Sequence, residues 1–108
     1  MNPGELTEQA IWDEIRKVYD PEIPVNIVDL GLVYSCVLKP LPDGGRRVEV
    51  KMTLTTPGCS MADVLRDDVE SRIRAMPGVT ETQVDLVWDP PWTQAMMTEA
   101  ARLELGLM

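Results

Sequence analysis

Residues 48–61 read VEVKMTLTTPGCSM and indicate the fold class most clearly, because one regular pattern ends there and another begins. Apolar residues alternate with polar ones from Val48 to Thr55, which is the spacing of a strand with one buried face. The alternation puts Thr53 and Thr55 on the outer face. Pro57-Gly58 then turns the chain and places Cys59 at the start of a segment with helical spacing. The stretch therefore predicts a strand that leads to a cysteine at a helix N-terminus.

The segment after Cys59 predicts an amphipathic helix. Ser60 is a favoured N-cap residue, and Asp63 can reach back to it in a capping box. Pro77-Gly78 ends the helical pattern. A single apolar stripe follows the helical period and comprises Met61, Val64, Leu65, Val69, Ile73 and Met76.

The chain before this stretch predicts a helix, a loop and a strand. The helix takes Thr7 as its N-cap and carries Ile11, Ile15, Val18 and Tyr19 on one face until Asp20-Pro21 stops it. The proline-rich residues 20–29 are expected to form an ordered loop against the body of the protein. Residues 32–39 alternate and should pair with residues 48–55 as an antiparallel hairpin, with Cys36 on the inner face.

Downstream, a third strand is expected to carry Val84, Leu86 and a core-facing Trp88, while Trp92 could pack or dock a partner. A last helix should run from about Thr93 to Gly106 with Met97 and Ala101 on its apolar side. The predicted order is helix, strand, strand, helix, strand, helix. This order is typical of an α+β fold, a two-layer sandwich of a small three-stranded sheet with helices on one face. We expect one domain spanning residues 1–108.

Composition limits the function. Ten basic against eighteen acidic residues give a net charge of −8 without a basic run, which argues against nucleic acid as a partner. The apolar runs are too short to span a membrane, and the N-terminus does not resemble a secretion signal. We therefore expect a soluble cytoplasmic protein whose two cysteines, Cys36 and Cys59, are reduced.

The absence of histidine narrows the chemistry further, because Cys-His pairs, Ser-His-Asp triads and imidazole metal sites all need that side chain. A thiol at a helix N-terminus ionises readily, and a thiolate attacks electrophiles or binds soft metals. We favour a functional thiol at Cys59 over the alternative of a small buried side chain. Cys36 is expected to lie in the core. A Cys36–Cys59 pair is a minor alternative, since it needs Cα atoms within about 7 Å.

Other polar residues have two interpretations. Asp20, Glu22 and Asp29 can stabilise turns in the proline-rich loop, or they can supply hard ligands or a base beside the thiol if the loop folds over the start of the second helix. Thr55 and Thr56 can bond within a turn or line a ligand site, and the structural role is favoured. Residues that would support the thiol also include Gly58 and Ser60.

Four runs carry a family resemblance. They are Asp20-Pro21-Glu22-Ile23-Pro24, Asp29-Leu30-Gly31-Leu32-Val33-Tyr34, Met52-Thr53-Leu54-Thr55-Thr56-Pro57-Gly58-Cys59 and Trp88-Asp89-Pro90-Pro91-Trp92. Together they resemble the SufT family of iron-sulfur cluster assembly proteins, which is related to the phenylacetate-pathway protein PaaD. The resemblance implies a fold akin to the NifU C-terminal domain and a role in maturing iron-sulfur proteins. It places the functional cysteine at Cys59 and the acidic motifs at Asp20, Glu22 and Asp29.

The number of ligands refines this expectation. An iron-sulfur cluster normally needs four ligands, mostly thiolates, so Cys59 alone cannot hold one. We expect Cys59 to act in a transient cluster or iron site that a second protomer, a partner or a small thiol completes. Assembly machinery and client apoproteins are the expected partners, and a homodimer is one way to complete the site. The alternative is a metal-free adaptor that docks a metalloenzyme complex such as a phenylacetate-type oxygenase. A thiol enzyme is disfavoured, because no base or resolving cysteine accompanies Cys59.

Overall fold

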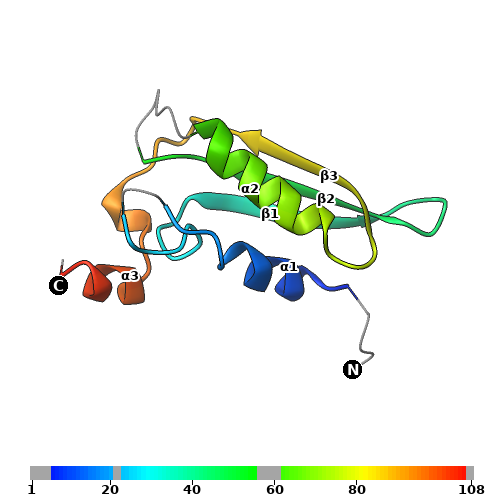
Figure 1. Cartoon of the computed structure of the whole chain (residues 1–108). Coiled ribbons are helices and arrows are strands. Elements are labelled where there is room, and N and C mark those ends of the chain that lie inside the picture. Colours follow the sequence, from blue (N-terminus) through cyan, green and yellow to red (C-terminus); the bar gives the residue numbers. More distant parts are fainter. Residues whose placement is uncertain (1–5, 21–22, 56–61, 107–108) are drawn as a thin grey trace.

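The computed structural model describes residues 6–20, 23–55 and 62–106 (Figure 1). The predicted order of elements is confirmed, with a short 3₁₀ helix added before the last helix. The elements are α1 (Glu8–Ile15), β1 (Val33–Pro40), β2 (Arg46–Met52), α2 (Ala62–Arg74), β3 (Val79–Leu86), η1 (Gln94–Met96) and α3 (Glu99–Glu104).

The sheet has the order β1-β2-β3. β1 and β2 form the predicted antiparallel hairpin, and β3 runs parallel to β2 after the crossover through α2. α2 packs against β3 and α1, while α1 also packs against β1. Figure 1 shows this arrangement, with the loops after α1 and the C-terminal segment gathered at the same end of the sheet. The expected α+β architecture is therefore confirmed.

The core follows the alternation read from the sequence. Register places Cys36 opposite Val50 and Leu38 opposite Val48, and Cys36, Val48 and Val50 are buried. On α2 the residues four apart, Leu65, Val69 and Ile73, are buried as predicted. The expected place of Val64 in that stripe is wrong, because this residue is 54% exposed.

The first helix begins as predicted, since the Thr7 side chain accepts a hydrogen bond from the Ala10 backbone N–H at 3.1 Å. Its expected extension to residue 19 is wrong, because the helix ends at Ile15. Val18 and Tyr19 instead pair with the following loop. The Ile27 N–H donates to the Val18 carbonyl at 2.9 Å, and Tyr19 forms an isolated bridge with Asn26 that leaves its side chain 59% exposed.

The C-terminal segment differs most from expectation. A continuous helix from Thr93 is wrong, because Met97 adopts an extended backbone between η1 and α3. This break buries Met97 and lets Thr98 cap α3 by accepting from the Ala101 N–H at 3.2 Å. The core assignment of Trp88 is also wrong, since β3 ends at Leu86 and Trp88 is 45% exposed.

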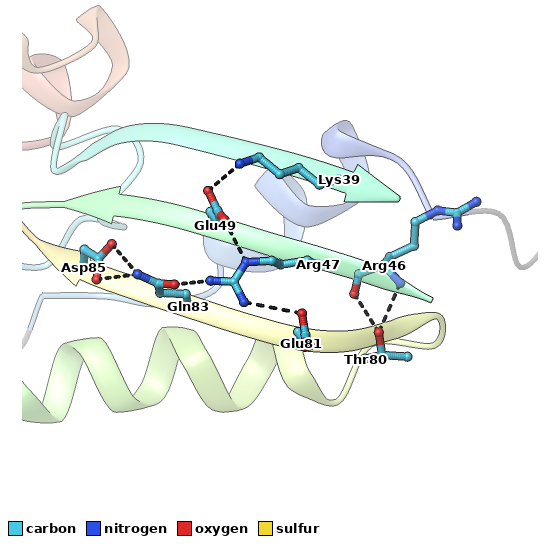
Figure 2. A network of polar contacts seen from close by, with 8 residues as sticks. All are labelled: Lys39, Arg46, Arg47, Glu49, Thr80, Glu81, Gln83 and Asp85. Atoms are coloured by element: carbon cyan, nitrogen blue, oxygen red, sulfur yellow. Dashed lines mark hydrogen bonds and ion pairs between the residues drawn. The ribbon is translucent and has the colours of Figure 1, made fainter. Parts of the chain in front are cut away.

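The sheet face that carries Arg47 and Glu49 bears a polar network (Figure 2). Arg47 donates to Glu49 at 2.7 Å, pairs with Glu81 at 3.4 Å and also donates to Gln83. Lys39 pairs with Glu49 at 3.1 Å. Hydrogen bonding to Glu49 raises the pKa of Arg47, and hydrogen bonding to Arg47 lowers the pKa of Glu49. These charges are thus compensated by their neighbours on the sheet, and Lys39, Glu81 and Gln83 are exposed to solvent on this face.

Candidate functional site

The candidate site lies where β2 leads toward α2. Four of the predicted residues of this stretch, Thr56, Gly58, Cys59 and Ser60, lie outside the described residues, and so does Glu22 of the acidic loop. Their roles stay predictions. The structure describes what surrounds them in sequence: the end of β2, the start of α2, and the loop that carries Asp20 and Asp29.

The end of β2 is joined to the Asp-Leu-Gly motif. The Thr53 N–H donates to the Leu32 carbonyl at 2.7 Å, directly after Asp29-Leu30-Gly31. On the other side, the Val87 N–H donates to the Met52 carbonyl at 2.8 Å. Thr53 is buried rather than outward as predicted, because β2 ends at Met52 and the alternation of the strand does not continue to Thr53. The acidic loop is therefore fixed to the strand that leads to Cys59, while Thr55 is half-buried beyond that anchor.

Asp20 and Asp29 both stabilise turns. The Asp20 carboxylate accepts from the Ile23 N–H at 3.1 Å, and this side chain is buried. The Asp29 carboxylate accepts from the Asn26 amide at 2.8 Å, while the Asp29 N–H donates to the Asn26 side chain at 2.9 Å. Arg16 lies 4.0 Å from the same carboxylate. The structural interpretation of these two acids is thus confirmed, and ligand binding by them stays a prediction.

Asp29 also lines a cavity of about 250 Å³ between the acidic loop and α3. Tyr19 and Asn26 line one side of it, and Glu104 of α3 lines the other. Asp29 and Glu104, which are far apart in the sequence, thus line the same cavity. Sequence reasoning missed Glu104, because nothing in its neighbourhood distinguishes it from a solvated helix residue.

The C-terminal segment holds the Asp-Leu-Gly motif in place. The Trp92 indole N–H donates to the Leu30 carbonyl at 2.7 Å, and the Thr98 N–H donates to the Asp29 carbonyl at 2.9 Å. Gly31 has a φ of +81°, and a Cβ added there would lie 2.3 Å from the Met96 carbonyl oxygen. Of the two roles considered for Trp92, packing and docking a partner, the structure supports packing. A sequence can indicate such a contact only through the residue type, because the indole N–H of a tryptophan needs a hydrogen-bond partner when the ring is buried.

Cys36 occupies the core, as predicted. Its residue is 7% exposed, and burial, aided by the negative charge of Glu8, raises the pKa of the thiol to about 11. At neutral pH this sulfur is a protonated thiol, which is a poor nucleophile and a poor metal ligand. Within the described ranges, no group of three or more Cys, Asp or Glu residues is placed to hold a metal ion. Those residues also include no helix long and apolar enough to cross a membrane.

Comparisons with known proteins place the chain in a family. The model of a family described as iron-sulfur cluster assembly protein matches residues 8–86. An Fe-S protein maturation auxiliary factor of Porphyromonas gingivalis is 45% identical over 94% of this chain and 93% of its own length. The Fe-S protein maturation auxiliary factor SufT of Staphylococcus aureus is 41% identical over 83% of this chain and 98% of its own length.

A solved structure has the same fold. A domain of unknown function from Bacillus anthracis superposes with a TM-score of 0.80 at 34% identity, covering 94% of this chain and 92% of that one. The resemblance inferred from the four sequence runs is thereby confirmed at the level of family and fold.

Proposed function

The chain belongs to the iron-sulfur cluster assembly protein family, and from this membership we propose that it is an accessory factor in the maturation of iron-sulfur proteins. The observation that carries the proposal is the match over residues 8–86, which contains the acidic loop, β2 and Cys59. The relatives named as maturation auxiliary factors align over nearly their whole length. The cluster, or iron, is cargo that passes to client proteins.

In this proposal Cys59 supplies a thiolate to a transient site. Helix dipole and free backbone N–H groups at the predicted N-terminus of α2 would stabilise the negative charge. Cys36 is a poor second ligand, because its thiol is buried and protonated. The remaining ligands of a cluster must therefore come from elsewhere: a second protomer, a partner protein or a small thiol. Such a site binds its cargo weakly enough to release it.

Partners follow from this role. Assembly proteins that deliver iron-sulfur cargo and apoproteins that receive it are the proposed contacts, and the protein has no catalytic turnover of its own. We place this activity in the cytoplasm.

The test is complementation in cells that lack the chain and are starved of iron. We expect the activity of cluster-dependent dehydratases to fall in the deletion strain, while the amount of dehydratase protein stays constant. The wild-type chain supplied on a plasmid should restore the activity. Cluster-independent enzymes serve as the control. Equal dehydratase activity with and without the chain under iron starvation would overturn the proposed function.

Thiol labelling tests the assignment of the reactive sulfur. With iodoacetamide at neutral pH, we expect rapid modification of one equivalent at Cys59, while Cys36 reacts only after unfolding. The rate at Cys59 should be nearly constant from about pH 7 to 9, whereas the rate of an ordinary thiol, with a pKa of about 8.5, keeps rising over that range. Cys36 should stay slow throughout, because its pKa of about 11 keeps it protonated.

Peptide mass spectrometry of the labelled chain identifies the modified sulfur. In the Cys59→Ser variant the rapid phase should vanish. Rapid labelling of Cys36 in the folded protein would contradict its core position, and a steadily rising rate at Cys59 would contradict a stabilised thiolate.

A further inference from the structure

An apolar groove with a volume of about 620 Å³ opens between α1, the start of β1 and the C-terminal segment. Its lining residues are mainly apolar or aromatic and come from four separate parts of the chain. They include Trp12, Val28, Val33, Tyr34, Pro90 and Met96. The groove lies outside the stretch that leads to Cys59.

One wall of the groove is held in place by Tyr34. Its hydroxyl donates to the Pro90 carbonyl at 2.7 Å and lies 3.6 Å from the Met96 sulfur. This contact fastens the beginning of β1 to the C-terminal segment. Pro90 and Met96 lie beyond residues 8–86, the part that the family model matches. The groove is thus built between the part that the family model matches and the C-terminal segment that follows it.

The composition of the lining suits a peptide. Trp, Tyr and Met are enriched at protein interfaces, where aromatic rings give a large rigid contact area. The flexible thioether of Met96 can adjust to different partner side chains. Trp12 and Met96 are half-buried, so parts of both side chains remain accessible.

The charged residues near the groove indicate the sign of the charge that a partner should carry. Glu8 lies one helical turn before Trp12 on α1 and is exposed, and Asp89 is exposed next to Pro90. Arg16, one turn after Trp12, is paired with Asp13 at 3.9 Å and Asp29 at 4.0 Å. The whole chain carries a net charge of −8. We refer to Glu8 and Asp89, the exposed acidic neighbours of the lining residues Trp12 and Pro90, as the acidic rim. Together with the negative net charge, these carboxylates complement a basic partner and repel a second copy of this chain.

We propose that this groove binds a short segment of a partner protein in which an apolar anchor is flanked by Lys or Arg. The identification of that partner as part of cluster maturation rests on the proposed function, whereas the binding itself does not. The apolar anchor fills the space between Trp12 and Met96, and the flanking cations meet the acidic rim.

The test uses two fluorescent peptides with the same Leu-Ser-Leu-Phe centre, one flanked by three lysines and the other by three glutamates on each side. We expect the full-length chain to bind the lysine peptide at least about tenfold more tightly, which corresponds to about 1.4 kcal/mol. Its affinity should fall when salt rises from about 50 to 500 mM, because screening weakens the contacts with the rim. In NMR spectra, the lysine peptide should shift the Trp12 indole and Gly31 amide signals.

A charge reversal inside the groove sharpens the test. Met96→Lys should weaken the lysine peptide about tenfold and strengthen the glutamate peptide, an inversion that loss of packing alone does not produce. The matched control is Val64→Lys, which adds the same charge at an exposed apolar position on α2 and should leave both affinities unchanged. Circular dichroism checks that each variant is folded.

Three results would overturn the proposal. They are equal affinity of the two peptides for the wild-type chain, NMR shifts confined to another surface, and a folded Met96→Lys variant without the inversion. If sedimentation shows a dimer that the Met96→Lys change dissociates, a second copy occupies the groove and the proposal is wrong. The wild-type peptide comparison decides the matter if Met96→Lys does not fold. Peptide binding by Cys59→Ser should equal that of the wild type, so failure of the thiol proposal and failure of the groove are distinguishable.

Discussion

Replacing Cys59 with serine should reduce dehydratase activity in iron-starved cells to the level of the deletion strain. Serine keeps the shape and the capping capacity of the side chain, but its hydroxyl does not ionise at neutral pH and is a poor ligand for iron in sulfur-rich sites. The expected loss is therefore chemical rather than structural. Dehydratase activity per unit of dehydratase protein is the measurement, with immunoblots of the variant to show equal abundance.

Cys36→Ala is the matched control for this experiment. It removes the other sulfur, which lies in the core, and should lower the free energy of unfolding by about 1 kcal/mol while leaving maturation intact. Wild-type maturation by Cys59→Ser would refute the thiol mechanism and favour the metal-free adaptor. An equal loss in both variants at equal abundance would show that Cys59 is not the sole functional sulfur.

Substituting alanine for Gly31 should lower the free energy of unfolding by about 3 kcal/mol or more. Two costs add at this position. Its φ of +81° is unfavourable for any residue with a Cβ, by about 1–2 kcal/mol. The new Cβ would also lie 2.3 Å from the Met96 carbonyl oxygen, so backbone must move and the contacts of the neighbouring Leu30 and Asp29 carbonyls with the C-terminal segment are strained. Urea unfolding followed by tryptophan fluorescence measures the loss.

Gly44→Ala separates these two costs. Gly44 has a similar φ of +91°, yet a Cβ there would meet nothing within 4 Å. We expect a loss of only about 1–2 kcal/mol, from the backbone conformation alone. Equal losses at Gly31 and Gly44 would mean that the contact of the new Cβ with Met96 does not lower the free energy of unfolding.

Local pattern was sufficient for much of the fold. The alternation around Val48 and Val50 assigns both residues to the inner face, because a shift by one residue would turn both outward, and the same alternation puts Cys36 on the inner face of the partner strand. Thr7 caps α1 through a bond to a residue three positions away, which a short sequence window can reveal. The turn bonds of Asp20 and Asp29 are equally local.

Contacts between distant segments escaped prediction. The break at Met97 depends on the bond from Thr98 to the Asp29 carbonyl, whose partners lie far apart in the sequence. The early end of α1 likewise depends on the pairing of Val18 with Ile27, which competes with continued helix. For the candidate site, the sequence indicated the loop, the strand and the cysteine. It could not indicate that Thr53 bonds to Leu32, because no local pattern encodes that contact.

The hydrogen bonds from Trp92 and Thr98 to the acidic loop determine what is lost when the chain is shortened at its C-terminal end. A minimal unit cut to the matched residues 8–86 would retain the Asp29 and Leu30 carbonyls but lose both donors that satisfy them. In such a unit these two carbonyls need other partners, from water or from an adjoining sequence. The segment after β3 thus acts as a brace for the acidic loop, and a chain shortened to residue 86 loses that brace.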